Sequence, residues 1–147
     1  MLPSTNAVVD IYNAVSLRFA IPVGGENAEA YIGAPRLVRA AGAEPFETMQ
    51  SGLPMTETPE KGEVVWRDDV GVTCRRWNWR QGTRTRIEND TNRMWFILEA
   101  LSPLPNDALM AAGSELIGGI RVLSPASSAI VCQLSKAGVE DLTQTFA

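Results

Sequence analysis

The sequence contains no histidine. Histidine is the usual general base at neutral pH, the usual activator of a serine or cysteine nucleophile, and a common zinc ligand. Its absence excludes a Ser-His-Asp or Cys-His catalytic centre, so any catalysis by this chain proceeds without imidazole. The two cysteines, Cys74 and Cys132, form no metal-spaced pair, and we expect reduced thiols, no metal and no cofactor.

Long apolar runs are also missing. No stretch approaches the roughly 18 apolar residues of a membrane-spanning helix, and no basic-then-apolar leader opens the chain. We therefore expect a cytoplasmic protein with no membrane partner. The net charge of -4 argues against wholesale coating of nucleic acid, although one local basic patch stays compatible with it. The length of 147 residues suffices for a genuine core, and we expect residues 1–147 to form a single domain.

The basic and aromatic residues that are present gather in one place. The central segment, Trp66–Asn92, holds six of the eleven arginines and three of the four tryptophans. No acidic residue occurs between Val70 and Ile87, in a chain with an acidic excess overall. This concentration indicates a local function for the segment.

A β-hairpin is predicted at the start of the central segment. Its strands are Glu63–Arg67 and Val72–Gln81, and Asp68–Gly71 forms the turn. Side chains alternate between the two faces of a strand. On that basis the polarity of each face of the second strand changes halfway along it. One face changes from apolar to polar residues, and the other face changes from polar to aromatic residues. Such a change is typical of a strand that passes from a core to a cleft, or that carries a bulge.

The rest of the chain predicts an α+β fold, with strands clustered between helices near each end. The helices are predicted from the helical spacing of apolar residues and from capping residues, and the strands from alternation of apolar and polar residues. Gly and Pro mark the turns and loops between them. The predicted elements are a helix over Ala7–Phe19, a tight turn at Gly24-Gly25, a strand over Arg36–Arg39, a loop over Met49–Lys61, a strand over Met94–Leu101, a helix over Asp107–Ile120 capped by Asn106, and a strand over Ala129–Leu134.

The arginines of the central segment allow two interpretations. They could form a solvated sheet face paired with scattered carboxylates. They could instead line a groove for phosphate or carboxylate, because the planar guanidinium makes bidentate contacts and stacks on tryptophan. Trp77 and Trp79 likewise suit either base stacking or core packing.

Several polar residues stand alone in apolar sequence. Asn13, Glu44 and Glu99 are such residues, and each is either satisfied by a structural partner or part of a polar pocket. Cys74 precedes Arg75 and Arg76, which could lower the pKa of its thiol. We favour a buried strand thiol for Cys74.

Several short segments run in a familiar order. They are Val-Asp-Ile-Tyr-Asn-Ala-Val at 9–15, Pro22, Val-Arg-Ala-Ala-Gly-Ala-Glu at 38–44, Cys-Arg-Arg-Trp-Asn-Trp-Arg at 74–80, Thr91, and Phe-Ile-Leu-Glu-Ala at 96–100. From about Pro3 to about Ile120 the chain resembles the editing domain of the bacterial phenylalanyl-tRNA synthetase beta subunit, the B-three/B-four domain. It is still more similar to the freestanding relatives of that domain, which carry a segment like residues 74–80.

The resemblance implies a three-layer sheet/sheet/helix fold and a pocket for the end of a mischarged aminoacyl-tRNA. The implied activity is hydrolysis of mischarged aminoacyl-tRNA in trans. Where the synthetase domain has a histidine, this chain has Gly24, and where it has a Gly-Gly loop, this chain has arginines and tryptophans. Tyrosine, the amino acid removed by the synthetase domain, therefore need not be the substrate here.

The resemblance and the residues together give a candidate site. Its expected partners are the tRNA acceptor end and an aminoacyl ester or free amino acid. The catalytic candidates are Asn78 and Arg80; the substrate-binding candidates are Asn13, Glu44, Glu99 and Trp77; the tRNA-binding candidates are Arg75, Arg76, Arg84 and Arg86. Two other functions stay open: a non-catalytic module that binds tRNA or an amino acid, and a metabolite enzyme on the same fold.

Overall fold

The computed structural model describes residues 4–135 and 137–143. It divides into two compact units. The first unit combines Met1–Ile21 with Ala100–Ala147, and the second is Pro22–Glu99. The single domain expected over residues 1–147 stays a prediction.

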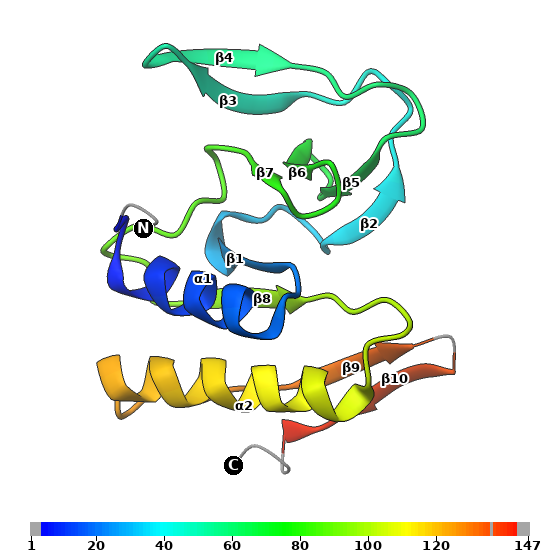
Figure 1. Ribbon diagram of the computed structural model, residues 1–147. Helices are drawn as coiled ribbons and strands as arrows, with labels where there is room; N and C mark the ends of the chain where they lie inside the picture. Colours follow the sequence, from blue (N-terminus) through cyan, green and yellow to red (C-terminus); the bar gives the residue numbers. More distant parts are fainter. Residues whose placement is uncertain (1–3, 136, 144–147) are drawn as a thin grey trace. The chain divides into compact units, whose positions relative to one another are not determined.

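The first unit pairs two helices and carries a β-hairpin (Figure 1). Its elements are α1 (Ala7–Phe19), α2 (Asn106–Leu123), β9 (Cys132–Ser135) and β10 (Gly138–Asp141). The side chain of Asn6 caps α1 by accepting a hydrogen bond of 2.9 Å from the Val9 N–H. The helices approach closely at Gly119 of α2, where a β-carbon would lie only 2.8 Å from Cγ2 of Ile11.

The second unit contains two sheets. Its elements are β1 (Val23–Asn27), the 3-10 turn η1 (Ala28–Ala30), β2 (Arg36–Arg39), β3 (Phe46–Gln50), β4 (Leu53–Glu57), β5 (Val64–Arg67), β6 (Val72–Arg75), β7 (Arg80–Gln81) and β8 (Met94–Leu98). The strands β1 and β8 pair antiparallel as a two-stranded sheet. The larger sheet has the order β2-β5-β6-β3-β4, and β7 pairs with β6. Its core cluster is Ala40, Phe46, Val65 and Val72, with Val38 packed against it.

The α+β class is confirmed, and so are the helix over Ala7–Phe19 and the strand over Arg36–Arg39. The apolar segment predicted as a strand over Met94–Leu101 forms β8, which ends at Leu98. The three-layer order stays a prediction, because it concerns the placement of the two units.

Three local predictions are wrong. The loop expected over Met49–Lys61 is largely the β3–β4 hairpin, whose strands meet at a turn with positive φ at Ser51 and Gly52. The turn expected at Gly24-Gly25 is part of β1. The cap of α2 is Pro105, with no side-chain hydrogen bond, and Asn106 is the first helical residue. In the first two cases strand pairing overrides a local composition signal.

Candidate functional site

The strand predicted over Val72–Gln81 is broken into a second hairpin, β6–β7. Cys74 pairs with Gln81 and Arg75 with Arg80, so the four residues 76–79 form the connecting turn. Arg76 and Trp77 have φ values of 50° and 67°. These left-handed conformations reverse the chain direction, which is why strict face alternation across this stretch does not hold.

The left-handed residues of the turn are held by β5 and the residue before it. The Trp77 N–H donates to the Val64 carbonyl at 2.8 Å, and the Arg76 N–H donates to Oε1 of Glu63 at 3.0 Å. Trp77 also forms an isolated bridge with Val65. A left-handed residue other than glycine costs roughly 1–2 kcal/mol, and these bonds offset that cost.

The side chain of Asn78 rests on the backbone of β1. A β-carbon at Gly24 would overlap the Asn78 carboxamide. Gly24 does not have a positive φ, so the close approach of Asn78, and not backbone conformation, is what favours glycine at this position. Gly24, the position that the resemblance matches to a histidine, is thus covered by an amide in this chain.

Four buried polar atoms of the second unit have no hydrogen-bond partner among the described residues. They are three donors, Trp77 Nε1, Asn78 Nδ2 and Trp95 Nε1, and one acceptor, Glu99 Oε2. A buried polar group left unpaired costs about 1–3 kcal/mol, and most such groups in native proteins are paired. Unpaired donors and an acceptor in one small unit indicate a site for a polar ligand.

Glu99 has one fixed oxygen and one free oxygen. Its Oε1 accepts a hydrogen bond of 2.9 Å from Trp66 Nε1. The Trp66 ring meets the Trp95 ring edge-to-face, with centroids 5.9 Å apart. Burial raises the pKa of Glu99, and the Trp66 hydrogen bond lowers it in part. Trp66 follows Val65, the bridge partner of Trp77, so Glu99 and Trp77 are held by adjacent residues of β5.

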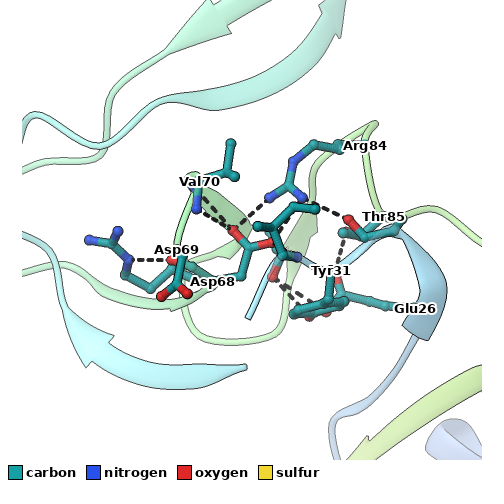
Figure 2. A network of polar contacts seen from close by, with 12 residues as sticks. Glu26, Tyr31, Asp68, Asp69, Val70, Arg84 and Thr85 are labelled. Carbon is teal, nitrogen blue, oxygen red and sulfur yellow. Dashed lines mark hydrogen bonds and ion pairs between the residues drawn. The ribbon is translucent and has the colours of Figure 1, made fainter. Parts of the chain in front are cut away.

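The buried carboxyl group of Glu26, on β1, was missed by the sequence analysis. It is only 4% exposed and accepts hydrogen bonds from the hydroxyls of Tyr31 and Thr85, and a long one from Thr73 (Figure 2). Burial raises its pKa, against the lowering effect of these bonds. The sequence does show a lone glutamate after Val-Gly-Gly, which could have indicated a buried carboxyl group. The glycine pair instead led to the prediction of a turn at this position.

Cys74 is a buried strand thiol, as favoured from the sequence. It is 5% exposed, and burial, with the nearby Glu26 and Glu99 charges, raises its pKa to about 12. The adjacent arginines therefore do not activate it.

Asp68 organises the turn between β5 and β6. It accepts hydrogen bonds from the backbone N–H groups of Ile32, Val70 and Gly71, and both its oxygens accept from Arg84 at 2.9 Å (Figure 2). Burial raises its pKa, but Arg84 and the backbone donors bring it down to about 2. Arg84, a tRNA-binding candidate, is thus paired with a fully buried carboxylate.

Arg75 and Arg80 are also paired with carboxylates. Arg75 contacts Glu57 at 2.7 Å and Glu63 at 2.7 Å, and Arg80 contacts Glu57 at 2.6 Å. Arg75 lowers the pKa of Glu63 to about 2. The roles predicted for Arg75 and Arg80 stay predictions, but a phosphate or substrate carbonyl would have to share these guanidinium groups with glutamates.

Glu44 stabilises the loop formed by the residues just before it. Its carboxylate accepts hydrogen bonds from the N–H groups of Ala41, Gly42 and Ala43, at 2.8, 2.9 and 3.1 Å. The Ala41 N–H is the main cause that lowers the pKa of Glu44 to about 2. These contacts give Glu44 a structural task, and its predicted substrate contact stays a prediction.

The remaining candidates are placed as follows. Asn13 is half-buried on α1, in the first unit, whereas the other candidates lie in the second. Arg76 and Arg86 are exposed and form no ion pair among the described residues. The structure therefore separates free arginines from those engaged in ion pairs, a division that the sequence did not give.

No group of three or more Cys, Asp or Glu side chains within the described ranges is arranged to hold a metal ion. The described helices include none that is long and apolar enough to cross a membrane. Among protein families, the model of the B3/4 domain matches residues 1–108. Searches of curated proteins and of solved structures each gave no match.

Proposed function

The chain belongs to the B3/4 domain family, the domain found in the phenylalanyl-tRNA synthetase beta subunit, and from this we propose that it hydrolyses the ester bond of mischarged aminoacyl-tRNA in trans. The family supports a role related to tRNA synthetases. Editing sites exist because binding alone rejects a close amino-acid analogue by only roughly 1–3 kcal/mol.

The observation that carries this proposal is the set of unpaired polar atoms on Trp77, Asn78 and Glu99. Two N–H donors suit a carbonyl oxygen, and one carboxylate oxygen suits an ammonium, a hydroxyl or a water. An aminoacyl ester carries both kinds of group within a few bonds. The side chains of Trp77 and Asn78 belong to half-buried residues, so a small rotation would present their N–H groups to a ligand.

The reaction proceeds without imidazole. Water adds to the ester carbonyl, and the carbonyl oxygen takes up negative charge, which Asn78 Nδ2 and Trp77 Nε1 stabilise. The bond from the carbonyl carbon to the ribose oxygen then breaks, and that oxygen leaves as a hydroxyl. A neighbouring ribose hydroxyl of the substrate takes up the proton of the water and passes its own proton to the leaving ribose oxygen, so no side-chain base is needed, and Glu99 Oε2 orients the amino-acid part.

A deacylation assay tests the proposal. Wild-type protein is incubated with a panel of correctly charged and mischarged tRNAs, and release of the amino acid is followed. The variant Asn78→Ala should lower kcat by on the order of 100-fold, because it removes one oxyanion donor. The matched control is Asn89→Ala, which removes an exposed asparagine of the same unit and should leave kcat unchanged.

A non-catalytic module that binds tRNA or an amino acid is the second candidate. It is favoured by the ion pairs that occupy Arg75 and Arg80, since these leave few cations for a transition state. Binding of tRNA or of an amino acid without release from any charged tRNA would establish this candidate and refute hydrolysis. The cytoplasmic location expected from the sequence is compatible with either candidate function.

A further inference from the structure

We propose that Trp79 and Arg76, on the β6–β7 turn, form a stacking platform for the unpaired nucleotides next to the aminoacyl ester. The platform lies on the turn that also holds Asn78 and Trp77. The identity of the partner rests on the proposed function, whereas the platform itself rests on the exposed geometry of the turn.

Trp79 is an exposed residue of the turn. Its residue is 76% exposed, whereas Trp66 is 7% exposed. The Arg76 guanidinium lies over the Trp79 ring, with its Cζ 5.5 Å from the ring centroid. This cation–π contact holds the indole in place without burying it. The Trp79 N–H also contacts the Arg76 carbonyl at 3.4 Å, which links the two residues through the backbone.

The arginines of the hairpin divide into two kinds. Arg75 and Arg80 lie over the Phe46 ring and pair with Glu57, so their charges are used inside the unit. Arg76 is exposed and has no ion pair among the residues that the structure describes. A phosphate can therefore reach the Arg76 guanidinium without competing with a glutamate of this unit.

The left-handed backbone of the turn directs its side chains into different surroundings. Asn78 is directed against Gly24, and the Trp77 Nε1 is buried, while Arg76 and Trp79 are exposed on either side of them. Consecutive Cα atoms are about 3.8 Å apart. Residues that contact an ester and residues that contact the adjoining nucleotide would thus be neighbours in the chain, as the ester and nucleotide are neighbours in the ligand.

An indole with an adjacent guanidinium matches unpaired RNA better than a protein partner. Every base offers a face for stacking, and each nucleotide brings a phosphate for the arginine. A protein interface would need an apolar centre around the indole. The residues beside Trp79 on the turn are instead asparagine and arginine, which argues for the nucleotide.

The test uses uncharged RNA, so that its result does not depend on hydrolysis. Two fluorescent RNA hairpins are compared, one blunt and one with a four-nucleotide single-stranded 3′ end. Trp79→Ala should raise Kd for the overhanging hairpin by roughly 5- to 150-fold, the range for loss of one stacked base. Trp79→Tyr should retain most of the affinity, and Arg76→Gln should reduce the slope of log Kd against log salt by about 1.

Leu53→Ala is the matched control, because Leu53 is a large exposed side chain (69%) of the same unit. It should leave Kd unchanged. Absence of wild-type binding to the overhang, a Trp79→Ala value within two-fold of wild type, or an equal loss on the blunt hairpin would each overturn the platform. Stacking that depends on Trp79, in a protein that deacylates no tRNA, would uphold the platform and refute the hydrolytic function.

Discussion

The side chain of Asn78 touches Gly24, and the contact leaves no space for a β-carbon on Gly24. Asn78 belongs to the β6–β7 turn and Gly24 to β1, so this contact locates the turn relative to the β1–β8 sheet. The position of the Asn78 carboxamide therefore depends on the small size of residue 24.

Gly24→Ala should destabilise the fold by roughly 1–3 kcal/mol, because the added methyl group forces Asn78 to move. In an Asn78→Ala background the same change should cost less, with a coupling energy of about 0.5–3 kcal/mol. Urea unfolding of the four proteins measures the cycle. Gly118→Ala is the control, since nothing lies within 4 Å of that position in α2. Equal costs in both backgrounds would show that the contact does not hold Asn78.

Asp68 and Asp69 are neighbours with opposite surroundings. Asp68 is fully buried and paired with Arg84, whereas the Asp69 carboxylate, paired with Arg36, is 56% exposed. Asp68→Asn should cost roughly 3–5 kcal/mol, because it leaves the half-buried guanidinium of Arg84 without its carboxylate partner. Asp69→Asn should cost less than about 1 kcal/mol. Similar losses measured by denaturant unfolding would contradict this assignment.

The comparison of Asp68 with Asp69 also predicts how the free energy of unfolding depends on pH in the acid range. The pKa of Asp68 is lowered from 3.8 to about 2 in the fold, so its stabilising contribution is present above about pH 4. That contribution, about 2 kcal/mol, should be lost as the pH falls from 4 through 2. Asp68→Asn should lack this part of the decline in the free energy of unfolding, while Asp69→Asn should retain it. An identical acid profile for both variants would refute the linkage.

The helices were predictable because their signals are local. Asn6 caps α1 as a polar residue before an apolar stripe should, and the stripe itself buries Tyr12 and Val15. The β6–β7 turn was not predictable in the same way. Arg76 and Trp77 are poor candidates for positive φ, and the bonds that hold them come from Glu63 and Val64, which are distant in the sequence.

The candidate site was predictable in part. Glu99 stood out as a lone carboxylate in an apolar segment, and it is half-buried with a raised pKa. Its partner, Trp66, lies 33 residues earlier in the chain and could not be inferred from spacing. The arginines kept two interpretations, because sequence shows charge density but not which guanidinium groups are already paired.

Glu99→Gln separates a structural role for Glu99 from a role in ligand recognition. The glutamine oxygen can still accept the hydrogen bond from Trp66 Nε1, so that contact is retained. The free Oε2, an acceptor, becomes an NH₂ donor. We therefore expect near wild-type thermal stability at neutral pH and a changed order of preference among aminoacyl esters.

The raised pKa of Glu99 gives this variant a second readout. A carboxyl group with a folded-state pKa above its ordinary value of 4.5 favours the fold most below that value, and its contribution is lost as the pH rises through the folded-state pKa. Wild-type stability should carry this loss, and Glu99→Gln should not. Glu47→Gln, an exposed change in β3, is the control and should alter neither stability nor ester preference. Thermal unfolding across pH and deacylation are measured on the same preparations. Several kcal/mol of lost stability with an unchanged ester preference would make Glu99 a structural carboxylate held by Trp66, because recognition of a ligand would then not depend on its free oxygen.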